Sequence, residues 1–381
     1  MLCWPEPSTT YGPRKCPFRR QVKQTLIAAA IAAVLIITAN QPATAQSYPD
    51  GLYAEISTTK GLIVLSLDLQ RTPMTVANFV GLAEGTIEND AFPLGRPFHD
   101  GSEFNRVEAG HVIAWGQADS EVSRNTGYRI PNEIHPELGH GRAGMLGMGN
   151  AGPHTASNSF YITLGDRSYL DGDYTVFGNV HLGMDVVMRI EVGDDVDSVT
   201  IVRVGPEATR FRPDDASFQE MVEAVWERVR ATEAERARSD LQYVRNTWPR
   251  AESAAQGWQY VVLEEGQGST PSPGQRISLR YMGHTPQGLN FASTRDGCGP
   301  SWQGSSSPAG QPCDFVVGES AVTEGLDAAI QRMRPGARWI VVVPSELGYP
   351  LPGYYAAERP GELRFHISPN TMLIYDVEII G

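Results

Sequence analysis

The chain of 381 residues has only four cysteines and no excess of basic charge. Its formal net charge of −13 at pH 7 argues against a protein that binds the phosphate backbone of nucleic acids. There is no internal repeat and no segment biased enough in composition to be disordered. Hydrophobic residues make up 41% and charged residues 20%, as is typical of globular proteins. A chain of this length rarely folds around one core, so we expect two domains.

The chain also lacks a hydrophobic run of membrane-spanning length. The apolar run at 26–39 is shorter than the roughly 20 residues that cross a bilayer. A basic residue precedes this run and an A-x-A motif follows it, which is the pattern of a secretory signal peptide. We therefore expect residues 1–45 to be a leader that is cut after Ala45, and the protein to be periplasmic or otherwise exported. A retained membrane anchor is the alternative. We also expect translation to start at Val22.

Outside the leader only two cysteines remain, Cys298 and Cys313, on either side of a loop rich in Gly, Ser and Pro. In an exported protein this spacing suggests a disulfide bond. In the chain-entropy treatment of crosslinks, such a closure stabilises the fold by about 3 kcal/mol. Two free thiols are the alternative, and the loop offers too few ligands for a metal site.

The first half of the chain has mainly strand patterns. Residues 52–59 and 61–69 alternate apolar and polar side chains, whereas 72–85 has the spacing of a helix that Gly85 can end. Because glycines and strand patterns continue to Gly205, we expect residues 51–205 to form a β-rich domain with a few helices, built as a closed barrel.

Residues 206–256 have a different character, because the stretch 213–248 contains no glycine. We expect a long amphipathic helix that links two domains, with a capping box formed by Ser217 and Glu220. Its apolar stripe consists of Phe218, Met221, Val222, Val225, Trp226 and Val229. Packing of this stripe on a neighbouring domain is favoured over a dimer contact.

A second β-rich domain is predicted over 257–381. Strand patterns occur at 275–284, 337–344 and 371–380, and a short helix at 323–333 precedes a Pro-Gly pair.

Two motifs in the first half resemble ligand-binding sites, but the residues around or between them do not fit such sites. The G-x-G-x-x-G match at 139–144 is followed by glycines rather than by a helix, so a dinucleotide site is rejected. The cluster of His135, His140, Glu133 and Glu137 fits no common metal-ligand spacing. We interpret these four side chains as solvated loop residues.

The first domain resembles the cyclophilin family of peptidyl-prolyl isomerases. The resemblance covers 51–205 and is carried by "PFHDGSEFNRV", "GMLGMGNAGPHTASNSFYITLGD" and "YLDGDYTVFGNVHLGMDVV". It implies a closed antiparallel barrel capped by helices, and it gives Arg106 the catalytic role. Arg106 heads a mostly apolar run, and an arginine is costly to bury unless it is paired or used.

The chemistry suits an arginine. Amide resonance gives the X–Pro bond a rotation barrier of about 18–20 kcal/mol. A permanently charged guanidinium that donates a hydrogen bond to the prolyl nitrogen draws its lone pair out of that resonance. By the same resemblance the substrate-binding residues are His111, Val112, Asn150, Tyr161 and Leu170.

This domain departs from the family pattern at several positions. His111 replaces a phenylalanine, Ala114 replaces a glutamine that steadies the arginine, and Ser159 replaces a second glutamine of the pocket. The remaining departures are Trp115 for a glycine and Tyr169 and Tyr174 for a tryptophan and a histidine. An arginine with fewer supporting hydrogen bonds is less well preorganised.

The second domain resembles the FKBP-type isomerases, which catalyse the same reaction. The resemblance covers 257–381 and is carried by "GWQYVVLEEGQG", "ISLRYMGH", "FASTRD", "FVVGESAVTEGLDAAIQRMRPG" and "SPNTMLIYDVEI". It implies an antiparallel sheet around a short helix, with Tyr349 as the catalytic hydrogen-bond donor. The substrate-binding positions are Tyr281, Phe291, Phe315, Val322, Thr323, Leu326, Ile367 and Tyr375. Ala292 replaces the usual acidic residue, and Leu326 replaces a tryptophan. Ordinary core packing is the alternative for any one of these aromatic residues.

Together the two resemblances predict a mainly β protein: a cyclophilin-like barrel and an FKBP-like sheet joined by a long helix. The predicted function is peptidyl-prolyl cis-trans isomerisation that assists the folding of exported proteins. The alternative is a chaperone or scaffold that binds proline-containing peptides with little or no catalysis. We expect no cofactor and no metal, and as partners unfolded or proline-containing polypeptides. We expect no nucleic acid, and membrane contact only if the leader is retained. The sequence leaves the oligomeric state open.

Overall fold

The computed structural model describes residues 48–116, 125–295, 308–319, 323–350, 353–359 and 362–380. The predicted leader, Cys298 and Val322 lie outside these described residues. No helix of the described part is both long enough and apolar enough to cross a membrane.

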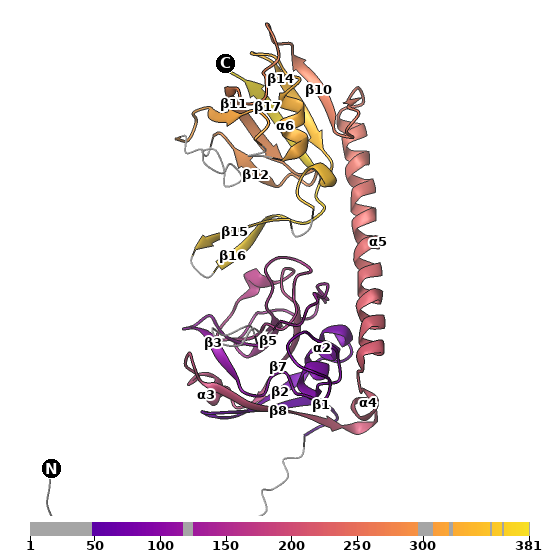
Figure 1. Cartoon of the computed structure of the whole chain (residues 1–381), viewed down its shortest axis with the longest axis vertical. Helices are drawn as coiled ribbons and strands as arrows, with labels where there is room; N and C mark the ends of the chain where they lie inside the picture. Colours follow the sequence, from indigo (N-terminus) through magenta and orange to yellow (C-terminus); the bar gives the residue numbers. More distant parts are fainter. Residues whose placement is uncertain are drawn as a thin grey trace, which may run out of the picture. The chain divides into compact units, whose positions relative to one another are not determined.

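Eight antiparallel strands close into a barrel in the first domain, as predicted (Figure 1). The order around the barrel is β1-β2-β7-β5-β6-β4-β3-β8. The strands are β1 (Gly51–Thr58), β2 (Gly61–Leu67), β3 (Ser102–Glu108), β4 (Val112–Trp115), β5 (Met145–Met148), β6 (Phe160–Thr163), β7 (Val176–Leu182) and β8 (Asp195–Val204). The short helices around them are α3 (Met184–Val187), η1 (Ser168–Leu170) and α4 (Gly205–Arg210). Large aromatic side chains fill the barrel, among them Phe79, Phe104, Trp115 and Phe160.

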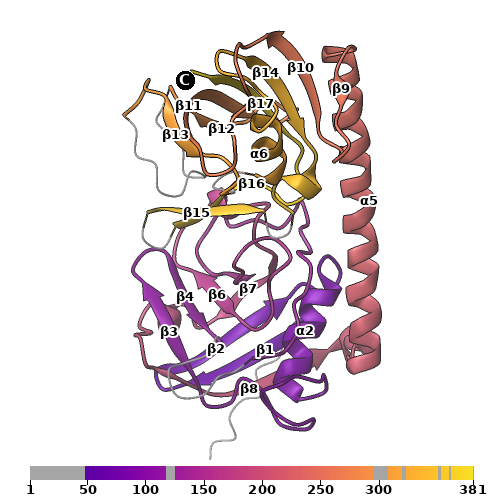
Figure 2. The same ribbon diagram turned by 45° about the horizontal axis from the view of Figure 1, so that its top comes forward.

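Helix α2 (Pro73–Glu84) covers this core and ends at Gly85, whose φ of 69° is the left-handed cap that the sequence predicts. The helix is buried on nearly every side, from Met74 to Ala83. A helix with one apolar stripe would leave its other face in water. Here the second face is covered by helix α5 (Asp215–Thr247), which packs against α2 (Figure 2).

Helix α5 is the long helix that the sequence predicts. Its capping box lies three residues before the predicted one: the Asp214 carboxylate accepts from the Ser217 amide, and the Ser217 hydroxyl bonds back to the Asp214 amide. The predicted box of Ser217 and Glu220 is therefore wrong, because the chain already enters the helix at Asp215. The predicted stripe does pack on the barrel core, with Phe218 and Val225 almost fully buried.

The second domain is a sheet with the strand order β12-β11-β17-β14-β10-β9, and β13 also pairs with β11. Its strands are β9 (Glu252–Ser253), β10 (Gln259–Glu264), β11 (Arg276–His284), β12 (Asn290–Ser293), β13 (Cys313–Val316), β14 (Arg338–Val343) and β17 (Leu373–Ile379). A separate hairpin joins β15 (Tyr354–Arg359) to β16 (Glu362–Ile367), and η2 spans Ser345–Leu347.

Helix α6 (Glu324–Ile330) packs its buried residues Leu326, Ala329 and Ile330 into the core of this sheet (Figure 2). Strand β9 pairs with β10, so the second sheet already begins at Glu252. The sequence places residues 206–256 in the linker, since a two-residue strand there carries no recognisable periodicity.

Candidate active sites

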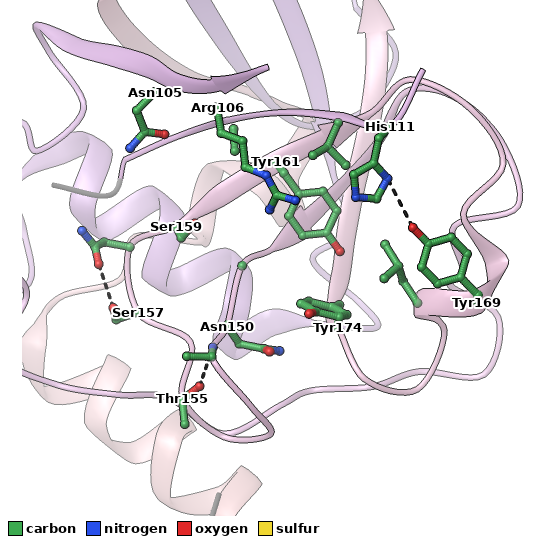
Figure 3. A pocket seen from close by; sticks show the side chains of 16 residues that line it. Asn105, Arg106, His111, Asn150, Thr155, Ser157, Ser159, Tyr161, Tyr169 and Tyr174 are labelled. Carbon is green, nitrogen blue, oxygen red and sulfur yellow. Dashed lines mark hydrogen bonds between the residues drawn. The ribbon is translucent and has the colours of Figure 1, made fainter. Parts of the chain in front are cut away.

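A pocket of about 330 Å³ opens on the barrel beside β3, β4 and β6. Figure 3 shows the side chains that line it. Among them are all six residues that the cyclophilin resemblance assigns to the first site: Arg106, His111, Val112, Asn150, Tyr161 and Leu170. The structure therefore brings this set together from four separate segments of the chain, and their roles toward a substrate stay predictions.

Arg106 lines the pocket but is not buried with the apolar residues that follow it in the sequence. Its side chain is 44% exposed, and its Nε donates to Glu108 Oε1 at 2.7 Å. Arg106 is therefore exposed and not buried as the sequence suggests, and the β3–β4 pairing shifts register between Phe104, which is buried, and Arg106. The hydrogen bond from Arg106 holds the pKa of Glu108 below its usual value.

Glu108 is a residue that the sequence analysis missed. Ala114 lies directly opposite Arg106 in the β3–β4 register and has no polar group with which to steady it. Side chains two residues apart on a strand share one face, so Glu108 reaches Arg106 along its own strand. An arginine and a glutamate two residues apart in a predicted strand, as at 106 and 108, could have indicated this ion pair from the sequence.

The apolar part of the pocket is formed by Val112, Ala114 and Tyr161, with Tyr174 packed against them. Strands β4 and β6 bring Ala114 opposite Tyr161. Gly147 on β5 pairs with Tyr161, and a Cβ at this glycine would lie 2.4 Å from the tyrosine Cζ. The ring can lie across β5 only because this position has no side chain.

The pocket wall near His111 is polar. The His111 ring stacks on Tyr169 with a centroid distance of 6.3 Å, and its Nδ1 lies 3.3 Å from the Tyr169 hydroxyl (Figure 3). Trp115 does not reach the pocket, because it is fully buried against Phe104 and Phe160 in the barrel. Its replacement of a glycine therefore changes the core rather than the site.

His140 is a second residue that the sequence analysis misjudged. It is fully buried, with Nδ1 2.6 Å from Asp171 Oδ1 and Nε2 2.7 Å from the Tyr161 hydroxyl. Asp171 can only accept when ionised, so Nδ1 donates to it and Nε2 accepts from Tyr161. Burial lowers the pKa of His140, although Asp171 opposes that shift. His140 thus fixes the hydroxyl of a pocket residue.

Glu133 is also not a solvated loop residue, since only 5% of it is exposed. Its Oε2 accepts from the amide and the hydroxyl of Thr75, at the first turn of α2. Burial raises its pKa, and the Thr75 hydrogen bonds act against that rise. His135 and Glu137, in contrast, are at least partly exposed. In the described part of the chain no group of three or more His, Cys, Asp or Glu side chains is arranged to hold a metal ion.

Asn150, the predicted anchor for the peptide backbone, lies on the loop 149–159 that borders the pocket. Its Nδ2 donates to the carbonyl of Asp173 at 2.9 Å, and its Oδ1 accepts from the Gly152 amide. Both bonds tie the side chain to the protein, so its orientation is set before a peptide arrives.

The residues predicted for the second site come together in the core of the second domain, on the side of α6. They come from β11, β12, β13, β16, β17 and from α6 with its N-cap residue, and all seven are at least nine-tenths buried. These residues are Tyr281, Phe291, Phe315, Thr323, Leu326, Ile367 and Tyr375. Tyr349 follows η2 and packs against this cluster while remaining partly exposed.

Tyr375 lies between the other aromatic side chains of this cluster. Its ring centroid is 5.5 Å from Phe291 and 6.5 Å from Tyr281, and its hydroxyl is 3.5 Å from Thr323 Oγ1. Burial raises the pKa of Tyr375 well above its usual value. Gly283 permits this packing, because a Cβ there would lie 2.5 Å from the Phe291 ring.

Cys313 is fully buried in β13 and is disulfide-bonded. Its predicted partner, Cys298, lies outside the described residues.

Comparison with known proteins assigns both domains. Residues 53–206 match the family model of cyclophilin type peptidyl-prolyl cis-trans isomerases, and residues 267–380 match that of FKBP-type peptidyl-prolyl cis-trans isomerases. A probable peptidyl-prolyl cis-trans isomerase A of Mycobacterium leprae is 40% identical over 131 residues, which cover 33% of this chain and 72% of that protein. Peptidyl-prolyl cis-trans isomerase B of Streptomyces anulatus is 37% identical over 133 residues, covering 34% of this chain and 76% of that protein.

Among solved structures, a cyclophilin type isomerase of Cryptosporidium parvum aligns with a TM-score of 0.34 and 21% identity, covering 40% of this chain and 98% of that one. Identity of 40% over most of a relative, together with two matched family models, places the chain without ambiguity. It belongs to the cyclophilin family of peptidyl-prolyl cis-trans isomerases, and it carries a second, FKBP-type isomerase domain in its C-terminal part.

Proposed function

We propose that this isomerase acts on unfolded, exported polypeptides with two catalytic sites, one built around Arg106 and the other around Tyr349. The observation that carries the proposal is the position of Arg106. Its guanidinium lines the same pocket as the apolar slot of Val112, Tyr161 and Leu170. A proline ring seated in that slot would bring its nitrogen toward the guanidinium.

The second site works without an acid or a base. Buried aromatic and aliphatic side chains form an apolar surface at which a twisted amide is favoured over the planar one, since the planar form is the more polar and better solvated. The Tyr349 hydroxyl would donate a hydrogen bond to the substrate at the edge of this surface.

The proposal of a role in folding outside the cytoplasm rests on the predicted leader and on the disulfide at Cys313. Uncatalysed X–Pro isomerisation takes tens to hundreds of seconds and limits the folding of many chains. An exported isomerase would remove that delay.

Isomerisation is tested on a refolding substrate whose rate is limited by proline. In a Tyr349→Phe background, Arg106→Ala should lower kcat/KM by about tenfold or more, as loss of a preorganised donor does elsewhere. Tyr349→Phe should likewise lower kcat/KM in an Arg106→Ala background. The double variant should approach the uncatalysed rate. Arg129→Ala, at an exposed arginine of the same domain, is the matched control and should keep full activity.

The second candidate function is a peptide-binding chaperone with weak catalysis. It is favoured by Ala114 and Ser159, which line the pocket with shorter side chains than the glutamines of the family pattern and give Arg106 fewer supporting hydrogen bonds. A rate no faster than the uncatalysed one, combined with suppression of client aggregation, would select this function over the first.

A further inference from the structure

Helix α5 lies outside both regions matched by the isomerase families, which end at residue 206 and begin again at 267. Yet its side chains contact the segments that carry Asn150 and Tyr349. We propose that α5 positions both catalytic sites: Trp226 holds the loop of Asn150 through His154, and Glu233 and Arg236 hold the segment of Tyr349 through Asn370. This inference rests on the proposed roles of Asn150 and Tyr349.

The first contact begins at Trp226, whose ring packs on His154 with a centroid distance of 5.2 Å. His154 belongs to the pocket loop and exchanges two hydrogen bonds with Asn132: its amide donates to Oδ1, and its Nδ1 accepts from the Asn132 amide. Asn132 and Asn150 then donate from Nδ2 to the same acceptor, the carbonyl of Asp173, at 2.8 and 2.9 Å. Trp226 is thus joined to the predicted anchor by a continuous series of contacts.

The backbone of His154 needs such support. Its φ of 61° lies in the left-handed region, which costs an ordinary side chain free energy unless neighbours hold it there. The Trp226 ring covers one side of His154, while Asn132 bonds to its backbone and its ring. Removing the Trp226 indole would expose His154 and loosen the loop at its residue with a left-handed backbone.

A second series of contacts reaches the same loop from the start of α5. Phe218 packs on Tyr128 with a centroid distance of 5.5 Å. The Tyr128 hydroxyl donates to Asn78 Oδ1 at 2.8 Å, and Asn78 Nδ2 donates to the carbonyl of Ser157, which lines the pocket. The loop is therefore held from α5 at two points.

The later part of α5 performs the same task in the FKBP-type domain. Arg236 Nη2 donates to the carbonyls of Pro369 and Asn370 at 2.7 and 2.9 Å, and Glu233 Oε1 accepts from Asn370 Nδ2 at 2.7 Å. The Asn370 amide donates to the carbonyl of Tyr349. Asn370 is the other non-glycine residue of the described chain with a left-handed backbone, at φ 53°.

These contacts form one stripe along the helix. Phe218, Trp226, Glu233 and Arg236 follow each other at intervals of eight, seven and three residues, which keeps them near one face of an α-helix. The stripe is apolar beside the barrel and polar beside the segment of Asn370. A helix that served only as a spacer would not need side chains matched to both catalytic segments.

The first contact is tested with Trp226→Ala in the Tyr349→Phe background, where the first site supplies the remaining activity. We expect KM for a proline-containing peptide to rise by about three- to thirtyfold, the range that residues outside a site exert through packed neighbours. The value of kcat should fall less, because Arg106 keeps its place. Trp226→Phe should restore most of the affinity, since a phenyl ring still covers His154.

The second contact is tested with Arg236→Ala in the Arg106→Ala background. The matched control is Arg238→Ala, at an exposed arginine two residues away. We expect Arg236→Ala to lower the remaining kcat/KM severalfold and Arg238→Ala to leave it unchanged. For Trp226, the corresponding control on the exposed side of α5 is Glu227→Ala.

Each outcome decides the inference. Faster amide hydrogen exchange at 149–158 together with a raised peptide Kd in Trp226→Ala would support it. An unchanged KM and unchanged exchange in a folded Trp226→Ala variant, or an equal effect of Glu227→Ala, would overturn it. Peptide binding and hydrogen exchange are measured without turnover. If Arg106→Ala left the activity intact, the proposed catalytic role would fail while these two readouts still tested α5.

Discussion

Arg106 and Glu108 form an ion pair within one strand beside the first pocket. The two side chains share a face of β3, and Glu108 accepts from Arg106 Nε at 2.7 Å. Ala114, opposite Arg106, contributes only apolar surface to the pocket. The guanidinium is therefore held along its own strand, at an exposed position where an ion pair is worth little in free energy.

We predict that Glu108→Gln lowers the activity of the first site by about two- to fivefold, which corresponds to the small free energy of an exposed pair. The measurement is kcat/KM in the Tyr349→Phe background. Because Arg106 lowers the pKa of Glu108, the ionised pair persists at neutral pH and is lost only as the pH falls through that lowered pKa. The difference in kcat/KM between Glu108→Gln and its parent should therefore disappear at acidic pH, where Glu108 is protonated. Glu103→Gln, at an exposed residue of the same strand, is the control; an equal loss there would contradict the role of Glu108.

At the scale of elements, α2 begins without a cap from its own segment. Thr72 occupies the N-cap position but makes no side-chain hydrogen bond there. Glu133, 58 residues further on than Thr75, supplies the acceptor for the Thr75 amide and hydroxyl. A carboxylate at this end also complements the helix dipole. Arg228 of α5 lies 3.7 Å from the same carboxylate, so three segments meet at this point.

We predict that Glu133→Ala destabilises the cyclophilin domain by about 1–2 kcal/mol, the usual cost of removing a helix cap. Glu137→Ala is the matched control, because Glu137 lies in the same loop as Glu133 and makes a surface ion pair with Arg71. That variant should change the free energy of unfolding by less than about 0.5 kcal/mol. Urea unfolding, combined with amide exchange in α2, distinguishes the two. Similar losses in both variants would show that the loop matters rather than the cap.

At the scale of the whole molecule, the barrel and the second sheet have separate hydrophobic cores. Helix α5 contributes to both sides, with Phe218 and Val225 in the barrel core and Val244 in a cluster with Ile340 and Val342 of β14. Two domains with separate cores can unfold separately when a treatment weakens only one of them. Reduction of the disulfide bond is such a treatment, since no cysteine lies between residues 51 and 205.

We predict that a reducing agent lowers the unfolding temperature of the FKBP-type domain and leaves that of the cyclophilin domain unchanged. The bond at Cys313 should contribute about 3 kcal/mol if it closes the loop from Cys298. Calorimetry with and without dithiothreitol measures both transitions. The variant Cys298→Ser/Cys313→Ser should behave like the reduced protein and show no further response. A shift in the cyclophilin transition would contradict the separate response of the two cores.

Much of the fold was predictable because it depends on local pattern. The alternation at 52–59 and 61–69 gives β1 and β2, and the helical spacing at 72–85 gives α2 with Gly85 as its cap. The predictions that failed depend on context. The sequence suggests a capping box of Ser217 and Glu220, whereas the helix begins three residues earlier, with Asp214 as its N-cap.

The sequence by itself determined most of the strands, the long helix and the two family memberships, and it named six residues that line the first pocket. These properties follow from periodicity and from ordered motifs, which are local in the chain. Only the tertiary structure decided that Glu133 caps α2, that His140 holds Tyr161, and that Trp226 supports the loop of Asn150. Burial and hydrogen bonding of a polar side chain depend on groups far away in sequence, so residues that resemble a solvated loop became fixed parts of the core and of the site.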